Sequence, residues 1–354
     1  MSEFMINETI AKIKVIGVGG AGGNALDDMI TTGITNVDFI AANTDSQDLN
    51  DSKANIKLQL GEKLTKGLGA GADPEVGRQA AEEDKEKIRV LLEETDLLFI
   101  TAGMGGGTGT GAAPTIAKIA KDMGVLTIAV VTKPFKFEGP RRNKNAEVGI
   151  SELEAAVDTL VVIPNDKLFE LPEKKITLKN AFLEANNILK IGIKGIADLI
   201  TNQGFINLDF ADVETTVKNS GVAMLGFGYA EGEDRALAAT EKALSSPLLE
   251  KEIKGARKIL LNVTGGMDLG LNEANEIANK ITEAAGEDTT EVIFGTVLDE
   301  EMNDSIKITI VATGFSESKN INNPRRVNER KKEKREIIDD YGSLDIPAFI
   351  RRKK

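Results

Sequence analysis

The segment GMGGGTGTG at positions 103–111 contains six glycines and two threonines in nine residues. The apolar run LLFI at 97–100 precedes it, and residues 112–123 follow with the apolar spacing of a helix. A buried strand, a glycine loop and a helix start present backbone N–H groups and a helix N-terminus to an anion. Glycine has no Cβ to hold a phosphate away, and threonine adds a hydroxyl donor. We therefore interpret this segment as a polyphosphate-binding loop rather than a flexible linker.

A second glycine loop follows the short apolar run IKVI at 13–16. Gly17, Gly19 and Gly22 satisfy GxGxxG, and Asp45 lies about 20 residues further on, as a dinucleotide-binding fold requires. This loop alone favours a nicotinamide-dependent oxidoreductase, which stays an alternative. A dinucleotide fold uses one such loop per cofactor, whereas two loops at the ends of two strands favour one nucleotide held from both sides. The sequence contains no GxxxxGK[ST] motif of the P-loop type.

The composition excludes several classes of chemistry. The 354 residues include no cysteine and no histidine, which removes thiolate nucleophiles, imidazole bases and the usual zinc sites. A formal net charge of −12 and the lack of tryptophan argue against a nucleic-acid partner. No apolar run approaches 18 residues and no signal peptide is visible, so we expect a cytoplasmic protein without a membrane span. Any metal ion is expected to arrive with the substrate rather than at a site built from side chains.

Apolar runs alternate with helical patterns from residue 13 to about residue 163, which predicts a parallel sheet covered by helices on both faces. The predicted strands include 37–42, 97–102, 126–132 and 160–163, and the predicted helices include 74–92, 114–123 and 146–156. Residues 178–202 then form the longest helical pattern, in which Gly192 and Gly195 indicate close packing. The sequence thus predicts an α/β nucleotide-binding domain followed by a long central helix.

A second, α+β domain is predicted from about residue 223. Its expected strands are 222–229, 258–263, 291–298 and 307–313, and its expected helices are 234–244 and 271–285. Residues 316–337 are polar and charged with almost no large apolar residues, which is typical of a disordered linker. The predicted organisation is an N-terminal extension (1–12), a nucleotide-binding domain (13–177), the central helix (178–202), the α+β domain (203–315), a linker (316–338) and a C-terminal peptide (339–354).

Several motifs together resemble the FtsZ family, the bacterial relatives of tubulin. They are IKVIGVGGAGGNA (13–25), GMGGGTGTGAAP (103–114), TKPFKFEG (132–139) and NLDFADV (207–213). The tail LDIPAFIR, from Leu344 to Arg351, resembles the C-terminal peptide of that family. The resemblance implies a tubulin/FtsZ-like fold and a GTPase that polymerises head-to-tail into filaments. Those filaments would form the mid-cell division ring of bacterial cytokinesis, and the cofactors implied are GTP or GDP with Mg²⁺ bound alongside.

The resemblance also implies which residues contact the nucleotide. Ala70 and Gly71 would lie near the γ-phosphate, and the remaining phosphate contacts would be Gly20, Ala21, Gly22, Gly23, Asn24, Gly107, Thr108 and Gly109. Glu138 and Arg142 would contact the ribose, although a spacing of four equally fits a surface ion pair on a helix. Near the guanine would lie Phe182, Asn165 and Asn186. Spacing alone makes Phe182 an equally good core residue.

The base-recognition position departs from many members of the family, which carry an aspartate there. Here the pair Asn186-Asn187 offers neutral amides. An amide oxygen still accepts a hydrogen bond from guanine but lacks the strength that a charge adds. A weaker preference for guanine over other bases is therefore expected.

The resemblance implies a catalytic acidic loop that contains Asn207, Asp209 and Asp212. This loop would reach the nucleotide of a neighbouring subunit, where both aspartates polarise the attacking water. The spacing of the two aspartates fits helix capping as well. The active site is thus expected only in the filament. The tail from Leu344 to Arg351 is expected to bind membrane-tethering and regulatory division proteins.

Overall fold

The computed structural model describes residues 11–34, 36–170, 177–202, 204–249, 251–286 and 290–315. These residues belong to one compact unit, which ends at Phe315. The predicted linker and C-terminal peptide lie outside the described residues, as does most of the predicted N-terminal extension.

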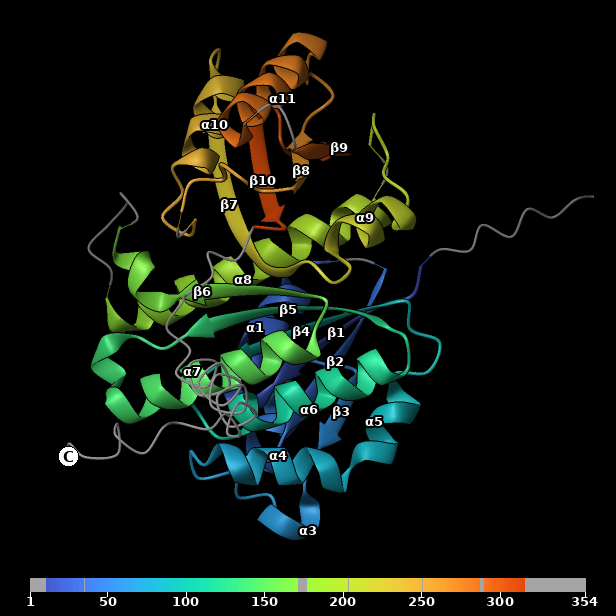
Figure 1. The fold of residues 1–354 in the computed structure, drawn as a ribbon, viewed down its shortest axis with the longest axis vertical. Helices are drawn as coiled ribbons and strands as arrows, with labels where there is room; N and C mark the ends of the chain where they lie inside the picture. Colours follow the sequence, from blue (N-terminus) through green and yellow to red (C-terminus); the bar gives the residue numbers. More distant parts are fainter. Residues whose placement is uncertain are drawn as a thin grey trace, which may run out of the picture. The chain divides into compact units, whose positions relative to one another are not determined.

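The described residues form one ten-stranded sheet in the order β3-β2-β1-β4-β5-β6-β7-β10-β8-β9 (Figure 1). The first six strands in that order are all parallel, which confirms the predicted sheet. Their bounds are β1 (Ile13–Val18), β2 (Val37–Asn43), β3 (Ile56–Gln59), β4 (Leu97–Gly103), β5 (Leu126–Lys133) and β6 (Thr159–Pro164). Each predicted strand of this half therefore exists, with ends shifted by at most a residue or so.

Helices cover both faces of this parallel half. Side chains alternate along β4, so Leu97 and Phe99 join the core that includes α1 (Gly19–Thr31) and α8 (Leu178–Thr201). Leu98 and Ile100 face the other way, into a core with the helices α4 (Pro74–Glu83), α5 (Lys85–Leu91), α6 (Thr108–Asp122) and α7 (Pro140–Ala156). The connecting segments hold the short elements α2 (Ser46–Asp51), α3 (Glu62–Thr65), η1 (Lys136–Glu138) and η2 (Asn165–Glu170).

Two helices differ from the prediction. The helix predicted over 74–92 breaks at Asp84, whose buried carboxylate accepts a hydrogen bond of 2.7 Å from Gly61 N. That long-range bond gives Asp84 a non-helical backbone and separates α4 from α5. The helix predicted over 114–123 starts six residues earlier, at Thr108, so that its first turn contains the last four residues of the glycine segment, 108–111.

The central helix α8 packs against both halves of the molecule. A Cβ on Gly195 would lie 2.6 Å from Thr309 Cγ2 of β10, in the second half, and a Cβ on Gly192 would lie 3.3 Å from Val130 Cγ1 of β5, in the parallel half. The close packing predicted at these two glycines is therefore confirmed.

No described helix is long and apolar enough to cross a lipid bilayer.

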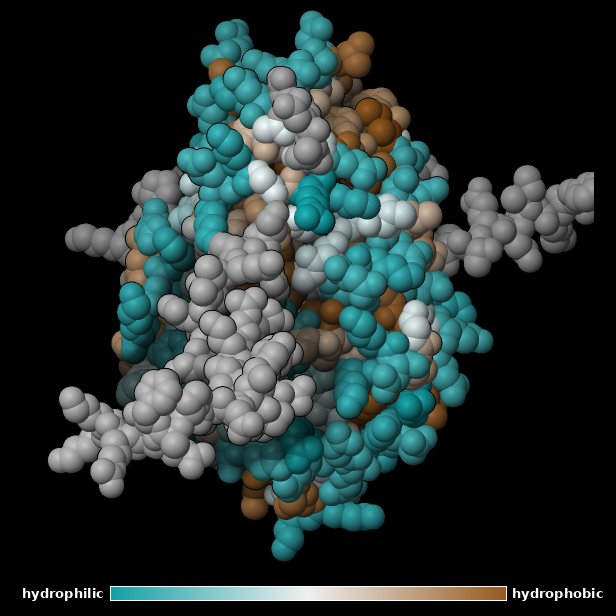
Figure 2. Space-filling model, viewed as in Figure 1, coloured by the Kyte–Doolittle hydropathy of each residue, from teal (hydrophilic) through white to brown (hydrophobic). Residues whose placement is uncertain are grey.

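The strand β7 (Gly221–Glu231) joins the two halves of the sheet. Its first three residues pair in parallel with β6, and the strand pairs antiparallel with β10 from Met224 onward. The second half contains the elements α9 (Phe210–Val217), α10 (Arg235–Leu244), β8 (Lys258–Gly265), α11 (Leu271–Ala285), β9 (Glu291–Leu298) and β10 (Ser305–Thr313). The predicted α+β elements are thus confirmed. Figure 2 shows hydrophilic residues over much of the visible described surface, while hydrophobic residues gather beside α11 and β9.

Candidate functional site

The two glycine loops lie side by side at one edge of the sheet. β1 and β4 are parallel neighbours, so their carboxyl ends at Val18 and Gly103 meet at that edge. Gly19 has a φ of +72°, and a Cβ there would lie 2.9 Å from Gly109 N. Only a residue without a side chain lets the first loop approach the second this closely. The loops therefore face one common space.

Two helix N-termini face this space. α1 begins at Gly19, directly after β1, and α6 begins at Thr108, directly after Gly107. Neither N-terminus has a side-chain cap, and neither first turn contains an acidic residue. The first N–H groups of a helix lack partners within the helix, so these two ends can donate to an anion. The arrangement suits a phosphate chain that is held from both sides.

The loops open onto a cleft of about 260 Å³. Most of the predicted nucleotide contacts line it, although they come from segments far apart in the sequence. The predicted residues along its walls are Gly20, Ala21, Gly107, Thr108, Gly109, Glu138, Arg142, Asn165, Phe182 and Asn186. The structure thus brings phosphate, ribose and base candidates together in one cleft.

The remaining phosphate candidates lie around the loops rather than in the cleft. Gly22 packs against β4, where a Cβ would lie 2.5 Å from a backbone oxygen. Gly23 and Asn24 line a second cavity of about 170 Å³, which shares Gly19 and Gly20 with the cleft and is also lined by Asp48. Ala70 touches the second loop, since a Cβ on Gly107 would lie 2.7 Å from Ala70 Cβ.

The ribose candidates form the ion pair that their spacing also predicted. Arg142 Nη1 donates to Glu138 Oε2 at 2.6 Å, and the other carboxylate oxygen accepts from Phe135 N at 3.0 Å. A carboxylate has about four acceptor positions, so Glu138 keeps capacity for a further donor. This side chain is 12% exposed, which places it at the wall of the cleft rather than in open solvent.

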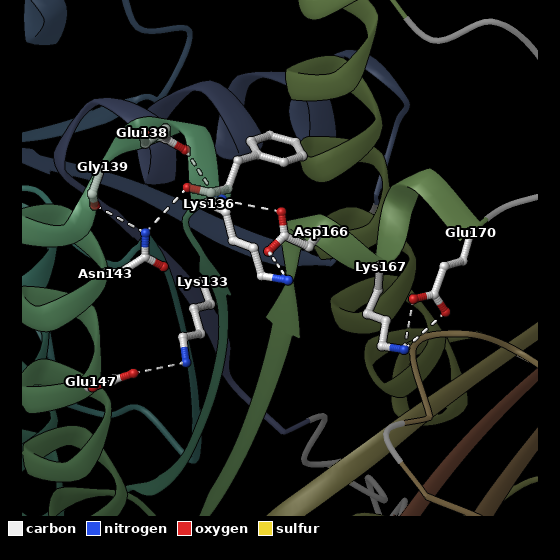
Figure 3. A network of polar contacts seen from close by, with 10 residues as sticks. Lys133, Lys136, Glu138, Gly139, Asn143, Glu147, Asp166, Lys167 and Glu170 are labelled. Atoms are coloured by element: carbon white, nitrogen blue, oxygen red, sulfur yellow. Dashed lines mark hydrogen bonds and ion pairs between the residues drawn. The ribbon is translucent and has the colours of Figure 1, made fainter.

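Polar contacts hold the loop of Glu138 in place, as Figure 3 shows. Lys136 N donates to Asp166 Oδ1 at 3.2 Å, which ties η1 to η2. Asn143 Nδ2 donates to Gly139 O at 3.1 Å on the opposite side of the loop. The wall of the cleft around Glu138 is therefore built from three elements that support one another, η1, η2 and α7.

A cluster of aromatic rings packs around Phe135, and one of them, Phe182, lines the cleft. Phe135 is buried, and its ring centre lies 4.9 Å from that of Phe137, 5.4 Å from that of Phe169 and 5.5 Å from that of Phe182. Phe182 itself is 43% exposed and lines the cleft. It is therefore not the core residue that its helical spacing also allowed.

Asn165 supplies an unpaired acceptor in the cleft wall. Its side chain is 4% exposed, and no described residue donates to its carbonyl oxygen. An unpaired buried acceptor costs about 1–3 kcal/mol, so a donor from a ligand would be stabilising. A purine nucleotide carries such donors on its sugar and its base, and the residues present fit that ligand.

The acidic loop lies away from the cleft. It follows the C-terminal end of α8, whereas Asn186 lies near the beginning of that helix. At 1.5 Å per residue, α8 is about 22 Å long from Asn186 to its end at Thr201. Asn207, Asp209 and Asp212 follow the far end of this helix, and none of them lines the cleft.

Within that loop, the two aspartates form a capping box. Asp209 Oδ1 accepts from Asp212 N at 2.9 Å, and Asp212 Oδ2 accepts from Asp209 N at 3.3 Å. Asn207 Oδ1 accepts from Gly204 N at 2.7 Å. The capping predicted from the spacing is thus present, and both aspartate side chains stay at the surface. Capping occupies only part of each carboxylate and leaves oxygen lone pairs free for a water molecule.

Asp45 does not act as the ribose-binding acid of a dinucleotide fold. Its carboxylate caps α2 by accepting from Gln47 N and Asp48 N. This removes the structural support for the oxidoreductase alternative.

Some cleft residues were missed by the sequence reasoning. Thr132 and Pro134 line the cleft at the end of β5, the strand next to β4. Ligands of parallel sheets bind at the carboxyl ends of the strands, and that rule was the signal for these two residues. Thr44 was missed as well. Its hydroxyl lies 2.7 Å from that of Thr108 and supports the second loop from the position directly after β2, where no motif marks it.

Comparison with known proteins also indicates a nucleotide-binding protein. The Tubulin/FtsZ family, GTPase domain, matches residues 12–173, and the FtsZ family, C-terminal domain, matches residues 221–316. The chain is 45% identical to an empty dimer of FtsZ from M. jannaschii, over 87% of this chain and 89% of that chain, with a TM-score of 0.83. It is 25% identical to the GDP-bound monomer of CetZ1 from Haloferax volcanii, over 91% and 99% of the two chains, with a TM-score of 0.75.

These matches cover both halves of the molecule, and they agree with the nucleotide cleft that the glycine loops form. The alternative interpretation, a nicotinamide-dependent oxidoreductase, is therefore wrong, and the chain is a guanine-nucleotide-binding GTPase. The chain belongs to the FtsZ family of GTPases.

Proposed function

We propose that this GTPase assembles head-to-tail into filaments and hydrolyses GTP at the junction between subunits. The observation that carries the proposal is the position of the acidic loop. It follows the end of α8 that is about 22 Å along the helix from Asn186, and it does not line the cleft, so we infer that its carboxylates act on a nucleotide in another subunit. The dimeric structure of M. jannaschii FtsZ, at 45% identity, supports association between copies.

In this proposal the chain holds the nucleotide by three kinds of contact. Backbone N–H groups at the starts of α1 and α6 bind the phosphates, and Glu138 and Arg142 bind the ribose. Asn165 and Asn186 bind the guanine edge beside the Phe182 ring. Mg²⁺ bound with the phosphates supplies positive charge that offsets the charge developing during hydrolysis.

The catalytic step falls to the loop of the adjacent subunit. Asp209 and Asp212 accept hydrogen bonds from the attacking water and orient it toward the γ-phosphate. Asn207 holds the loop closed through its bond to Gly204 N. Because neither subunit holds both the nucleotide and these carboxylates in reach, assembly switches hydrolysis on.

In the cell, we place these filaments in the cytoplasm, in a division ring at mid-cell. The support is the family membership together with the tail from Leu344 to Arg351, which resembles the family's C-terminal peptide. That tail would bind membrane-tethering and regulatory division proteins.

Sedimentation tests the assembly proposal directly. With GTP and Mg²⁺ the protein should pellet, whereas with GDP it should stay in the supernatant or form short oligomers. Equal pelleting with both nucleotides would contradict a switch that depends on the γ-phosphate.

A further inference from the structure

The amide of Asn186 has a defined orientation because of one partner on another helix. Asn186 Nδ2 donates to Asp28 Oδ2 at 3.2 Å, and both side chains are half-buried between α8 and α1. The two residues are 158 positions apart, so no local pattern in the sequence predicts the contact. Asn187 instead donates to Glu184 along its own helix and does not line the cleft.

This contact decides which end of the Asn186 amide faces the cleft. An ionised carboxylate only accepts hydrogen bonds, so the NH₂ group of Asn186 must turn toward Asp28. Rotating the amide by a half-turn would place its carbonyl oxygen against the carboxylate, with two acceptors in contact. Asp28 thereby leaves the carbonyl oxygen as the end of the amide that a ligand meets in the cleft.

The orientation of this amide matters for base selection. The edge of guanine that carries N1–H and the 2-amino group presents two donors and therefore needs an acceptor. Adenine presents an acceptor at N1, and xanthine presents a carbonyl oxygen where guanine has the 2-amino group. A freely rotating asparagine suits all of these bases, whereas an amide with its oxygen fixed toward the cleft suits guanine.

We propose that Asp28 is a specificity-determining positioning residue, which holds the Asn186 amide so that its oxygen reads guanine. The inference rests on the proposed function in one respect, because it requires the base to lie beside Asn186. It also changes one expectation from the sequence, in which a neutral amide in place of aspartate softens guanine specificity. The carboxylate of Asp28 would still act on the base, but through the amide of Asn186 rather than by direct contact.

The test compares binding of GDP and XDP by wild type, Asp28→Ala and Asp28→Lys. Each diphosphate is titrated against a fluorescent GDP analogue, and the ratio of the two dissociation constants is the readout. That ratio does not depend on the fraction of folded protein, so partial unfolding of a variant leaves it unchanged. Asp38→Lys is the matched control, because it makes the same charge change at an exposed site on β2.

Lysine only donates, so Asp28→Lys should turn the amide and present its NH₂ group to the base. We expect the preference for GDP over XDP to fall by about tenfold or more, on the scale of one or two hydrogen bonds. Asp28→Ala frees the amide and should give a smaller fall, while Asp38→Lys should keep the wild-type ratio. An unchanged ratio in both Asp28 variants, or an equal change in Asp38→Lys, would overturn the role of Asp28. A wild-type protein that binds GDP, XDP and ADP equally would instead contradict the guanine site itself.

Discussion

Gly109 lies where the two glycine loops touch, with backbone atoms on several sides. A Cβ there would lie 2.8 Å from Gly103 O and 3.3 Å from Val18 O. Backbone atoms at the ends of two sheet strands cannot move aside cheaply, so Gly109→Ala should push the loops apart. We expect the GDP affinity to fall by about tenfold or more, because several phosphate contacts are lost together. Isothermal titration calorimetry measures this change.

A control separates the loss of binding from the loss of stability. Ala112 lies in the same helix and is fully buried, but it does not line the cleft. Ala112→Gly should lower the free energy of unfolding by about 1 kcal/mol or more and leave the GDP affinity near that of wild type. If Gly109→Ala also bound GDP normally, the two loops would not form the phosphate site.

For single residues, the sequence predicts those whose role depends on neighbours in the chain and misses those whose role depends on distant partners. The glycines of both loops could be placed because a strand, a loop and a helix start lie within a short stretch. The partner of Asn186 could not, because Asp28 is reached only through the packing of α1 on α8. Asp45 had the right spacing for a ribose contact and caps a helix instead, since spacing along the chain does not fix direction in space.

Among the elements, β9 holds the acidic loop in position. Ile206 N donates to Thr296 Oγ1 at 2.8 Å, and Thr296 N donates to Ile206 O at 3.0 Å. Thr296→Val removes the hydroxyl and leaves a part-buried N–H without its partner, which costs about 1–3 kcal/mol locally. The loop should then sample other positions, and the GTP turnover of assembled filaments should fall several-fold. A phosphate-release assay on pelleted filaments measures the rate.

Thr296→Ser is the matched variant, because it keeps the hydroxyl and loses only a methyl group. It should retain most of the turnover, while both variants should bind GDP as wild type does. Normal turnover in Thr296→Val filaments would contradict a positioning role for this contact.

Elements were predictable where their periodicity was strong and their neighbours in sequence supplied the packing. The strands β4 and β5 are nearly fully buried, so their continuous apolar runs identify them. Short elements such as β3 and α3 carry too few residues for a periodic signal. The break at Asp84 comes from its bond to Gly61 N, a tertiary contact that overrides a good helical pattern.

For the molecule as a whole, one buried arginine links stability to acid pH. Arg235 is 5% exposed; its Nε donates to Glu273 Oε1 at 2.7 Å, and the guanidinium also pairs with Asp268. Hydrogen bonds from Arg235 lower the pKa of Asp268 from 3.8 and that of Glu273 from 4.5. Because the folded state lowers both values, the stabilisation is present above these ordinary pKa values and is lost as the pH falls through the folded-state values.

Arg235→Met should therefore lower the melting temperature at pH 7, with a loss of about 1–2 kcal/mol after solvent screening of the exposed carboxylates. The difference from wild type should shrink as the pH falls below about 4, where both carboxylates take up protons in the unfolded chain. Thermal unfolding followed by circular dichroism at several pH values gives both curves. A constant difference across this range would mean that packing, rather than the ion pairs, explains the effect.

If GTP is hydrolysed between subunits as proposed, the filament rather than the single chain is the catalytic unit. Asp212→Ala should bind GTP and assemble but hydrolyse GTP about 100-fold more slowly or worse, as expected for loss of a general base or water-orienting group. Since Asp212 also belongs to the capping box, Asp212→Asn is the matched variant. Its amide oxygen can still accept from Asp209 N, so it preserves the cap and removes only the charge. Slow turnover in both variants assigns the effect to the carboxylate.

Mixing two inactive variants tests whether the acidic loop acts on a neighbour. In Gly107→Val the new side chain would run into Ala70 Cβ, 2.7 Å from an ideal Cβ, so this variant should not bind GTP but keeps its acidic loop. Asp212→Ala keeps the cleft and lacks the carboxylate. In mixed filaments, the loop of a Gly107→Val subunit can face the GTP of an Asp212→Ala subunit, and phosphate release should rise above the sum of the separate rates. No gain in mixtures that co-sediment, or wild-type turnover by Asp212→Ala alone, would show that each subunit completes its own active site.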